Sequence, residues 1–514
     1  MANKAIKLYA KENGGRVLLL FLLFLLAIAL FISVGFNLFA IVCLIPVIIL
    51  AIYIAFNWQM TTFWLLIFIN YFLQCFNKNQ ILPNGIPISL YNELLEIILI
   101  CIAIIDTRKL PHFERLGNLM LLSLIIWCGF CTLEILNDTC GLGINIGAWY
   151  QGARLMAFQL LYAFIIFTLY ITTPQRLILY LRFWALLCLF SVFWTWKQIY
   201  IGPTHNEYAW LWNVGVTTHV LYGGTLIRWF STHNDAANYG VNAAAAAVLF
   251  IVIAITTKTK KDRFFYAITA ALVIWGMFQS GTRTAIFCMI AGFMVFLVLS
   301  KSFKIMIPSA ILGVTFLIIL IFTNIGNGNQ QIRRMRSAFN KDDASSGVRE
   351  INQSVMKKYL NEAPWGIGIG MGYDNVPANN KYRRMATIPP DSEYVFIWIR
   401  TGVIGITLFL ITTIIMLTGA CYIVLFKLKN QALMGIGAGL CGHFVAMQLG
   451  GYGNQVLMQF PNALITYGGL TIVYILPYIE QEWIEYENKI LAKQNEKKKL
   501  KLEKKKHSRV ETVF

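Results

Sequence analysis

Long hydrophobic runs, separated by mostly short polar intervals, follow one another along nearly the whole chain. Each run has about 17 to 24 residues, which is long enough to cross the hydrocarbon core of a bilayer as an α-helix. We count about fourteen such runs, and they predict an all-α integral membrane protein with about fourteen transmembrane helices. The predicted spans are residues 17–35, 38–56, 60–76, 89–106, 117–136, 155–173, 178–199, 236–257, 264–280, 284–300, 304–324, 402–425, 431–450 and 460–478.

One polar interval, in the last third of the membrane domain, is far longer than the others. Loops between neighbouring helices are usually short, so an interval of this length indicates a functional loop. We therefore predict a cytoplasmic N-terminus at residues 1–16 and a membrane domain at 17–478. That domain includes an external loop at 325–401, and a basic cytoplasmic tail follows at 479–514. Within the loop, residues 346–360 are amphipathic and predict a helical lid.

The positive charge of the chain follows the predicted topology. The formal net charge is +19, which in a soluble protein would indicate a nucleic-acid partner. In a membrane protein, lysine and arginine gather in the short cytoplasmic loops. With fourteen spans, all the short basic clusters fall on one face, so we expect both termini in the cytoplasm, contact with the lipid bilayer, and no nucleic-acid partner. The clusters are residues 4–16, 108–115, 176–182, 258–263, 301–304, 427–429 and 489–509.

The external loop contains glycines at alternating positions, in P-W-G-I-G-I-G-M-G (residues 364–372). Glycine lets a backbone turn sharply and approach a ligand closely. We therefore expect Gly366, Gly368 and Gly370 to lie against a bound glycan.

Two arginines at the external membrane boundary are candidates for binding an anion. Arg283 lies in Q-S-G-T-R-T (residues 279–284), a tight turn between two predicted spans. A guanidinium fork with neighbouring hydroxyl groups suits a phosphate or pyrophosphate, and an ordinary interfacial anchor is an equally good interpretation. Arg154 enters the sixth predicted span, where it either holds a phosphate or reaches the lipid headgroups.

The external loop at residues 202–235 carries three of the six histidines, His205, His219 and His233. Their spacing matches no compact metal-ligand pattern, so we predict no metal site and no cofactor. The loop ends in a polar motif immediately before the alanine-rich span at 236–257.

Four motifs occur together in one order along the chain: F-S-T-H-N-D-A-A-N-Y-G from Phe230, S-G-T-R-T from Ser280, S-G-V-R-E followed by P-W-G-I-G-I-G, and D-S-E-Y-V-F-I-W-I-R-T-G from Asp391. This ordered set resembles the O-antigen ligase/polymerase family of polytopic membrane glycosyltransferases. The resemblance covers roughly residues 224–425 and implies a GT-C-like fold in the inner (cytoplasmic) membrane.

The resemblance implies a reaction at the periplasmic face. Family members take a glycan from undecaprenyl pyrophosphate and move it to an acceptor glycan, which is lipid A–core in ligases and another lipid-linked repeat in polymerases. An acceptor hydroxyl attacks the anomeric carbon with inversion, without a metal, and arginines stabilise the leaving pyrophosphate. The positions implied for pyrophosphate binding are Arg283 and Arg349, with Arg228 and Arg154 as weaker candidates, and Asn234 is implied for glycan contact.

The chain departs from the family pattern at one position. Family ligases commonly have His-Asn where this chain has Asp391-Ser392. A carboxylate can also act as a general base, so Asp391 or Glu393 is expected to contact the acceptor. The loss of histidine favours a polymerase over a ligase.

A transporter or flippase of lipid-linked oligosaccharide is the competing interpretation. Fourteen spans and a positive external mouth suit such a protein. A transporter, however, typically shows two similar halves and charged groups at mid-membrane. No internal repeat is evident, and the polar motifs gather on one predicted face, which favours chemistry at the membrane surface.

Overall fold

The structure, a computed structural model, describes residues 49–82, 87–106, 112–301, 303–337 and 344–511, together with Gly15, Leu19, Phe21, Leu22, Phe24, Leu25 and Pro46. Side chains are not described for Ile305, Leu320, Ile321, 344–350, Ile490, Leu491 or 493–511. The predicted span 17–35 lies mostly outside the described residues, and of the predicted span 38–56 only Pro46 and residues 49–56 are described.

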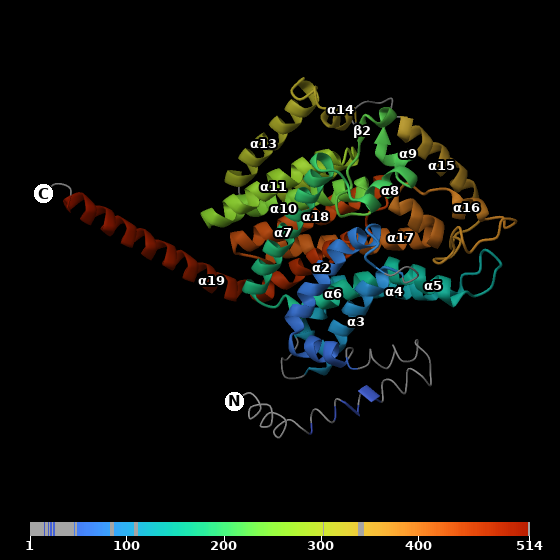
Figure 1. Ribbon diagram of the computed structural model, residues 1–514, viewed down its shortest axis with the longest axis horizontal. Coiled ribbons are helices and arrows are strands. Elements are labelled where there is room, and N and C mark those ends of the chain that lie inside the picture. The colour runs from blue at the N-terminus through green and yellow to red at the C-terminus, as the bar shows by residue number, and fades with distance from the viewer. Residues whose placement is uncertain are drawn as a thin grey trace, which may run out of the picture.

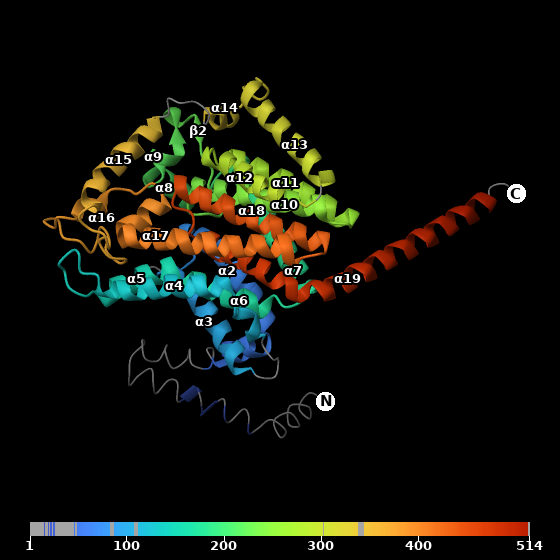
Figure 2. The ribbon, with the colours of Figure 1, turned by 180° about the vertical axis from the view of Figure 1, so that it is seen from behind.

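The described part of the chain is a bundle of helices with one short hairpin (Figures 1 and 2). In the first half, the helices are α2 (Gln59–Lys78), α3 (Ser89–Ile105), η2 (Phe113–Leu116), α4 (Leu119–Leu133), η3 (Glu134–Leu136), α5 (Ile146–Ala153), η4 (Arg154–Phe158), α6 (Gln159–Tyr170), α7 (Pro174–Tyr200), α8 (His205–Asn213) and α9 (Val216–His219). The hairpin pairs β1 (Val220–Leu221) with β2 (Leu226–Ile227) in antiparallel register around η5 (Tyr222–Gly224).

The second half continues with longer helices. They are α10 (Ala236–Thr256), α11 (Lys260–Gln279), α12 (Thr284–Leu299), α13 (Phe303–Phe322), α14 (Gln330–Arg336), α15 (Ala344–Leu360), α16 (Arg383–Thr387), α17 (Glu393–Tyr422), η7 (Ile423–Lys427), α18 (Gln431–Gly453) and α19 (Asn462–Glu511). The helix predicted at 346–360 within the long loop is confirmed as α15, and its role as a lid stays a prediction.

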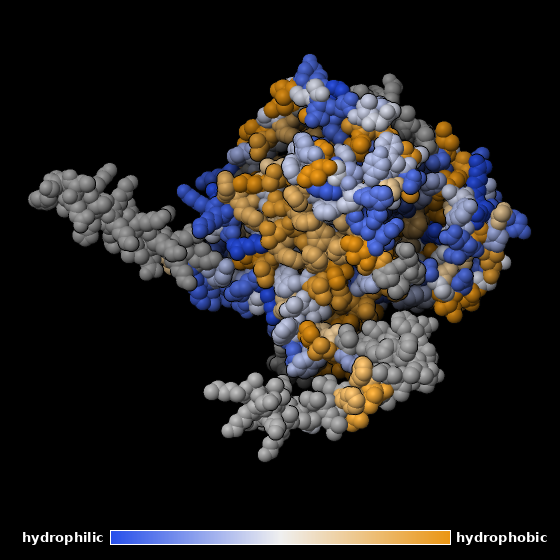
Figure 3. Space-filling model, viewed as in Figure 1, coloured by the Kyte–Doolittle hydropathy of each residue, from blue (hydrophilic) through white to orange (hydrophobic). Residues whose placement is uncertain are grey.

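Eight stretches among the described residues are long and apolar enough to cross a bilayer, so the chain is a multi-pass membrane protein. They are Gln59–Lys78, Leu119–Leu136, Ile146–Tyr170, Pro174–Tyr200, Ala236–Thr256, Glu393–Lys427, Gln431–Gly453 and Asn462–Lys489. Every predicted span from residue 60 onward coincides with a described helix, although the total of fourteen stays a prediction. The surface shown in Figure 3 is consistent with a membrane-spanning bundle, because a hydrophobic band crosses its middle between hydrophilic ends.

The centre of the bundle is formed by α10, α11, α12 and α18, which pack closely because small residues face one another. The alanine run at 243–247 of α10 is buried. Gly292 of α12 and Gly442 of α18 meet so closely that a Cβ atom on Gly292 would lie 2.6 Å from the Gly442 carbonyl oxygen. Small residues permit this backbone approach between membrane helices, and it makes α12 and α18 a rigid support for the loops at their ends.

Candidate functional site

Two of the sequence motifs meet at the end of α18. Residues 450–457 contain the last turn of α18 and the chain just beyond it, and we call them the α18–α19 turn. Asn454 of this turn donates a hydrogen bond from Nδ2 to Oγ1 of Thr284, the last residue of S-G-T-R-T (3.0 Å). The carbonyl oxygen of Gln455 accepts a hydrogen bond from Nδ2 of Asn238, in the motif before α10 (3.2 Å).

A third motif, D-S-E-Y at the start of α17, contacts the same turn. The Ser392 hydroxyl donates to the Gly451 carbonyl oxygen (3.2 Å), and Oε2 of Glu393 accepts from the backbone N–H of Leu457 (2.9 Å). Motifs that are far apart in sequence are therefore brought to one place by the α18–α19 turn. On this turn, Tyr452 leaves 72% of its side chain exposed, so an aromatic ring stands at the surface where the motifs meet.

Three arginines gather around S-G-T-R-T, and we call Arg228, Arg283 and Arg334 the arginine cluster. Gly281 stands between two of their side chains, because a Cβ atom there would lie 3.3 Å from Cγ of Arg228 and 3.2 Å from Cδ of Arg334. Its φ of 56° is in the left-handed region, which glycine adopts without strain. Glycine at this position thus allows Arg228 and Arg334 to reach the turn that carries Arg283.

The guanidinium groups of Arg228 and Arg334 are held by backbone and hydroxyl oxygens. Arg228 donates from Nε to the Ser280 carbonyl (3.3 Å), from Nη1 to the Thr218 carbonyl (2.9 Å) and from Nη2 to Oγ1 of Thr282 (3.1 Å). Arg334 donates from Nε to the Gly281 carbonyl (2.8 Å). These hydrogen bonds fix the orientation of the two guanidinium groups.

The loop that carries Arg228 is anchored by a buried lysine at the end of α2. Nζ of Lys78 lies 3.6 Å from the ring centroid of Trp210 and 3.7 Å from that of Phe230, and it donates to the carbonyl oxygen of His233 (3.1 Å). Cation–π contacts of this kind are strongest where water is excluded. Lys78 therefore joins α2, α8 and the motif before α10.

His219 links the same loop to the start of α10. Its Nε2 accepts a hydrogen bond from the backbone N–H of Ala236 (3.0 Å), so this nitrogen carries no proton. Burial, reinforced by the positive charge of Arg228, lowers the pKa of His219 to about 4. His219 is therefore neutral at neutral pH, and its Nε2 serves as a hydrogen-bond acceptor.

The two carboxylates of D-S-E-Y have different surroundings. Asp391 is half-buried, with a φ of 52°, and its Oδ2 accepts from Nδ2 of Asn352 in α15 (3.4 Å). Glu393 is 2% exposed and is held by the Leu457 N–H described above. A carboxylate buried against the backbone stabilises the α18–α19 turn, so the arrangement favours Asp391 over Glu393 for contact with an acceptor.

The glycine-rich segment packs against other parts of the protein, and the glycan contact expected for it stays a prediction. The N–H groups of Ile367 and Gly368 donate to the carbonyl oxygens of Ile399 and Arg400 in α17 (2.9 and 3.0 Å). At that point α17 is kinked at Gly402, where φ is 66°.

Each of the three glycines named from the sequence lies where another part of the fold approaches it closely. A Cβ atom on Gly366 would collide with the backbone of α17 at Arg400, and one on Gly370 would collide with the backbone of α5 at Ala148. On Gly368 it would lie 3.3 Å from Cγ of Met371. These glycines are therefore explained by packing of the loop on α5 and α17.

The remaining predicted residues are Arg154, Arg349 and Asn234. Arg154 begins η4, directly after α5, and forms a buried ion pair with Glu93 of α3 (3.3 Å). In Figures 1 and 2, α5 lies across the bundle from α14, which carries Arg334. Arg349 is in α15, but its side chain lies outside the described residues. Asn234 is half-buried in the turn before α10.

Two residues of the site were not selected from the sequence. Arg334 belongs to an arginine-rich stretch at 333–336, but nothing in the sequence shows which of these arginines reaches S-G-T-R-T. Asn454 lies in a glycine-rich turn, G-G-Y-G-N, whose composition indicates a turn without identifying its contacts.

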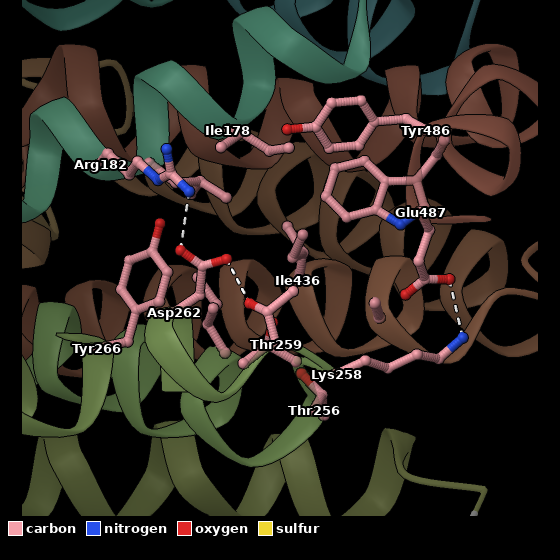
Figure 4. Close-up of a pocket in the computed structure, with 15 residues that line it drawn as sticks. Ile178, Arg182, Thr256, Lys258, Thr259, Asp262, Tyr266, Ile436, Tyr486 and Glu487 are labelled. Atoms are coloured by element: carbon pink, nitrogen blue, oxygen red, sulfur yellow. Dashed lines mark hydrogen bonds and ion pairs between the residues drawn. The ribbon is translucent and has the colours of Figure 1, made fainter. Parts of the chain in front are cut away.

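A second polar region lies at the other end of α10, in a pocket of about 680 Å³ between α7, α10, α11, α18 and α19 (Figure 4). Its cations are paired with carboxylates. Arg182 binds Asp262 and Lys258 binds Glu487, each at 2.8 Å. Ion pairs of this kind neutralise themselves and hold the ends of helices together, which indicates a structural region.

A family model described as O-antigen ligase matches residues 268–410, just over a quarter of the chain. The matched stretch includes S-G-T-R-T, the glycine-rich segment and D-S-E-Y. The resemblance to the O-antigen ligase/polymerase family is confirmed over these residues, and the match supports a membrane glycosyltransferase-like function. No curated protein matches the chain.

Proposed function

We propose, from the match to O-antigen ligase and the convergence of three motifs on the α18–α19 turn, that the chain is an inverting membrane glycosyltransferase. Its donor is a glycan on undecaprenyl pyrophosphate, its acceptor is the hydroxyl of a second glycan, and its site faces the periplasm. The observation that carries this proposal is the arginine cluster, which gathers guanidinium groups around one turn beside the α18–α19 turn.

The arginine cluster takes the role of stabilising the leaving group. When the bond between the anomeric carbon and the pyrophosphate oxygen breaks, negative charge grows on the diphosphate. Guanidinium groups that are already oriented stabilise this charge without rearranging during the reaction. Arg228 and Arg334 are oriented by their hydrogen bonds to carbonyl and hydroxyl oxygens. Arg283, in the turn between them, completes the cluster, and we assign Arg349 a supporting role at the same diphosphate.

Asp391 takes the role of general base. The acceptor hydroxyl attacks the anomeric carbon from the face opposite the diphosphate, and its proton passes to the Asp391 carboxylate. The new glycosidic bond forms as the old bond to the diphosphate breaks, so the configuration inverts and the lipid diphosphate leaves with the bonding electron pair. No metal ion enters this scheme, because the arginines supply the positive charge.

A polymerase is the form of the reaction that we favour. The chain carries Asp391-Ser392 where ligases of the family commonly have His-Asn. The acceptor in a polymerase is another lipid-linked repeat, and in a ligase it is lipid A–core.

The test is the surface polysaccharide of cells that lack the gene, analysed by gel and mass spectrometry. Single repeats capped on their acceptor indicate a polymerase. Long lipid-linked chains that are not transferred indicate a ligase, which would refute the form that we favour. Repeats trapped on the cytoplasmic side indicate a flippase and would refute a glycosyltransferase altogether. Complementation with Arg283→Ala should fail, because removing one preorganised donor costs about a hundred- to a thousandfold in rate.

A further inference from the structure

The last turn of α18 places an exposed tyrosine between two glycines. Tyr452 leaves 72% of its side chain exposed, whereas the glycine on either side of it faces another helix. A Cβ atom on Gly451 would lie 3.5 Å from Cβ of Glu393, at the start of α17. One on Gly453 would lie 2.5 Å from Cγ2 of Thr284, at the start of α12. The two glycines therefore mark the sides of the turn on which D-S-E-Y and S-G-T-R-T pack.

The direction of the Tyr452 side chain follows from helix geometry. Successive residues of an α-helix are turned by about 100°, so Tyr452 projects midway between the side that faces α17 and the side that faces α12. The opposite side belongs to Gly450, where a Cβ atom would lie 2.3 Å from Cγ1 of Val241 in α10. The helix α18 packs against both α12 and α17 and lies between them in Figure 2. Tyr452 therefore points away from α10, on the side of α18 that is flanked by the first residues of α12 and of α17.

Both neighbours of this tyrosine adjoin groups of the proposed reaction. Thr284 directly follows Arg283, which we assign to the departing diphosphate. Ser392, whose hydroxyl donates to the Gly451 carbonyl oxygen (3.2 Å), directly follows Asp391, the proposed base. In an inverting displacement the base and the leaving group act on opposite faces of the sugar, so the sugar that is transferred lies between them. The tyrosine stands on the turn that joins these two groups.

The surface around Tyr452 has the chemistry that a sugar ring requires. A pyranose carries C–H groups on its faces and hydroxyl groups around its edge, so each face offers an apolar surface to a flat partner. A tyrosine ring buries such a surface while its hydroxyl stays in water. Leu449, three residues earlier and therefore adjacent on the helix surface, is 38% exposed and extends the apolar area.

We propose that Tyr452 stacks on the first sugar of the donor, the pyranose whose anomeric carbon is bonded to the diphosphate. This inference rests on the proposed function and adds a residue that contacts the transferred glycan. The ring holds the sugar between Arg283 and Asp391, with the anomeric carbon directed at the attacking hydroxyl. Positive charge grows on the sugar as the bond to the diphosphate breaks, and the π face beside it stabilises that charge.

Two other roles for Tyr452 would leave donor binding unchanged. Tyrosine is common where a transmembrane helix meets the membrane–water interface, and there it anchors the helix. A contact with the acceptor glycan, which approaches from the side of Asp391, is the second role. The experiment must therefore measure the affinity for the donor with no acceptor present.

The test uses the full chain in nanodiscs of phosphatidylethanolamine and phosphatidylglycerol. The probes are undecaprenyl diphosphate without sugar and the same lipid carrying N-acetylglucosamine, galactose or mannose, and the readout is the dissociation constant of each. Tyr452→Leu removes the aromatic face, and Tyr452→Phe keeps it. Tyr200→Leu is the matched control, because Tyr200 ends α7 and is 67% exposed.

We expect Tyr452→Leu to weaken the binding of at least one sugar-bearing lipid by about tenfold and to leave the sugar-free lipid unchanged, because only the sugar meets the ring. Tyr452→Phe should bind all four lipids like wild type, and so should Tyr200→Leu. If Tyr452→Leu binds every sugar-bearing lipid as tightly as wild type, the stacking proposal is overturned. A loss in Tyr452→Phe as large as that in Tyr452→Leu would also overturn it, because the aromatic face would then not be what binds.

Failure of the proposed function would look different. A wild-type protein that binds none of the four lipids would refute the donor and, with it, the stacking. If Arg283→Ala loses affinity for all four lipids while Tyr452→Leu binds them like wild type, then the donor site stands and the stacking alone is wrong.

Discussion

The two ends of α10 hold polar groups in different ways. At its carboxyl end, in the pocket of Figure 4, Arg182 and Lys258 are each bonded to a carboxylate. At its amino end, about 30 Å away along the helix, the hydrogen bonds described for Arg228 run to carbonyl and hydroxyl oxygens. An ion pair neutralises its own charge, whereas hydrogen bonds to carbonyl and hydroxyl oxygens hold a guanidinium group in one orientation. The first arrangement is typical of a structural contact, and the second is the arrangement that we propose binds the diphosphate.

The largest expected effect is a difference in turnover between substitutions of two aspartates, one in D-S-E-Y and one in the pocket of Figure 4. Asp391 meets the amide of Asn352, a neutral partner, while Asp262 binds Arg182. We expect Asp391→Asn to lower the turnover rate by about a hundredfold or more with little change in thermal stability, because a general base is lost. Asp262→Asn should leave turnover nearly unchanged. Glycan transfer in proteoliposomes with a lipid-linked donor measures both.

The same transfer assay, combined with thermal unfolding, shows which of the two carboxylates of D-S-E-Y is the general base. Glu393→Gln should lower the melting temperature, because the carboxylate that accepts the Leu457 N–H is replaced inside the protein. A turnover loss for Glu393→Gln at unchanged stability, together with full activity of Asp391→Asn, would reverse the assignment of the base.

Arginine geometry gives the next largest effect. Arg228 uses three nitrogens on three acceptors, a pattern that lysine cannot reproduce. We expect Arg228→Lys to lower turnover by about a hundredfold through misplacement of the charge. Arg182→Lys keeps the charge of a half-exposed ion pair and should stay within about twofold of wild type. A loss for Arg228→Lys as small as that for Arg182→Lys would mean that Arg228 supplies charge rather than an oriented guanidinium group.

The helices could be predicted from the sequence because their signals are local. The predicted span at 236–257 coincides with α10 to within one residue, since Asp235 caps its first turn and apolar residues fill the rest. The site could be predicted only in part. S-G-T-R-T was found as a tight turn, but its neighbour Arg334 comes from a different part of the chain. The close packing of Gly366 and Gly370 could not be predicted, because the backbone that each approaches belongs to a distant helix. Such contacts between remote segments leave no periodic pattern in the sequence.

A smaller effect should appear in the dependence of stability on pH. The pKa of His219 is lowered to about 4 in the folded protein, so the unfolded chain binds a proton at higher pH than the folded one. Stability is therefore highest above the ordinary histidine pKa near 6.5 and is lost as the pH falls from there toward 4. Between pH 7.5 and 5.5 the loss attributable to His219 is about 1 kcal/mol. Thermal unfolding of wild type and His219→Gln at both pH values isolates it, because the variant lacks this contribution. Equal pH dependence in the two proteins would show that His219 is not the group responsible.

The smallest effect belongs to the paired charges of the pocket. Lys258 is 44% exposed beside Glu487, and exposed ion pairs contribute only a few tenths of a kcal/mol. Glu487 also accepts a hydrogen bond from Nδ2 of Asn430 (3.0 Å), which joins α19 to the loop before α18. Lys258→Met should therefore change the melting temperature little, and Glu487→Gln somewhat more, with transfer activity intact in both. If Lys258→Met instead abolished transfer at unchanged stability, the pocket would be a functional site. The ion pairs at the carboxyl end of α10 would then have a catalytic role, and the difference drawn between the two ends of the helix would be wrong.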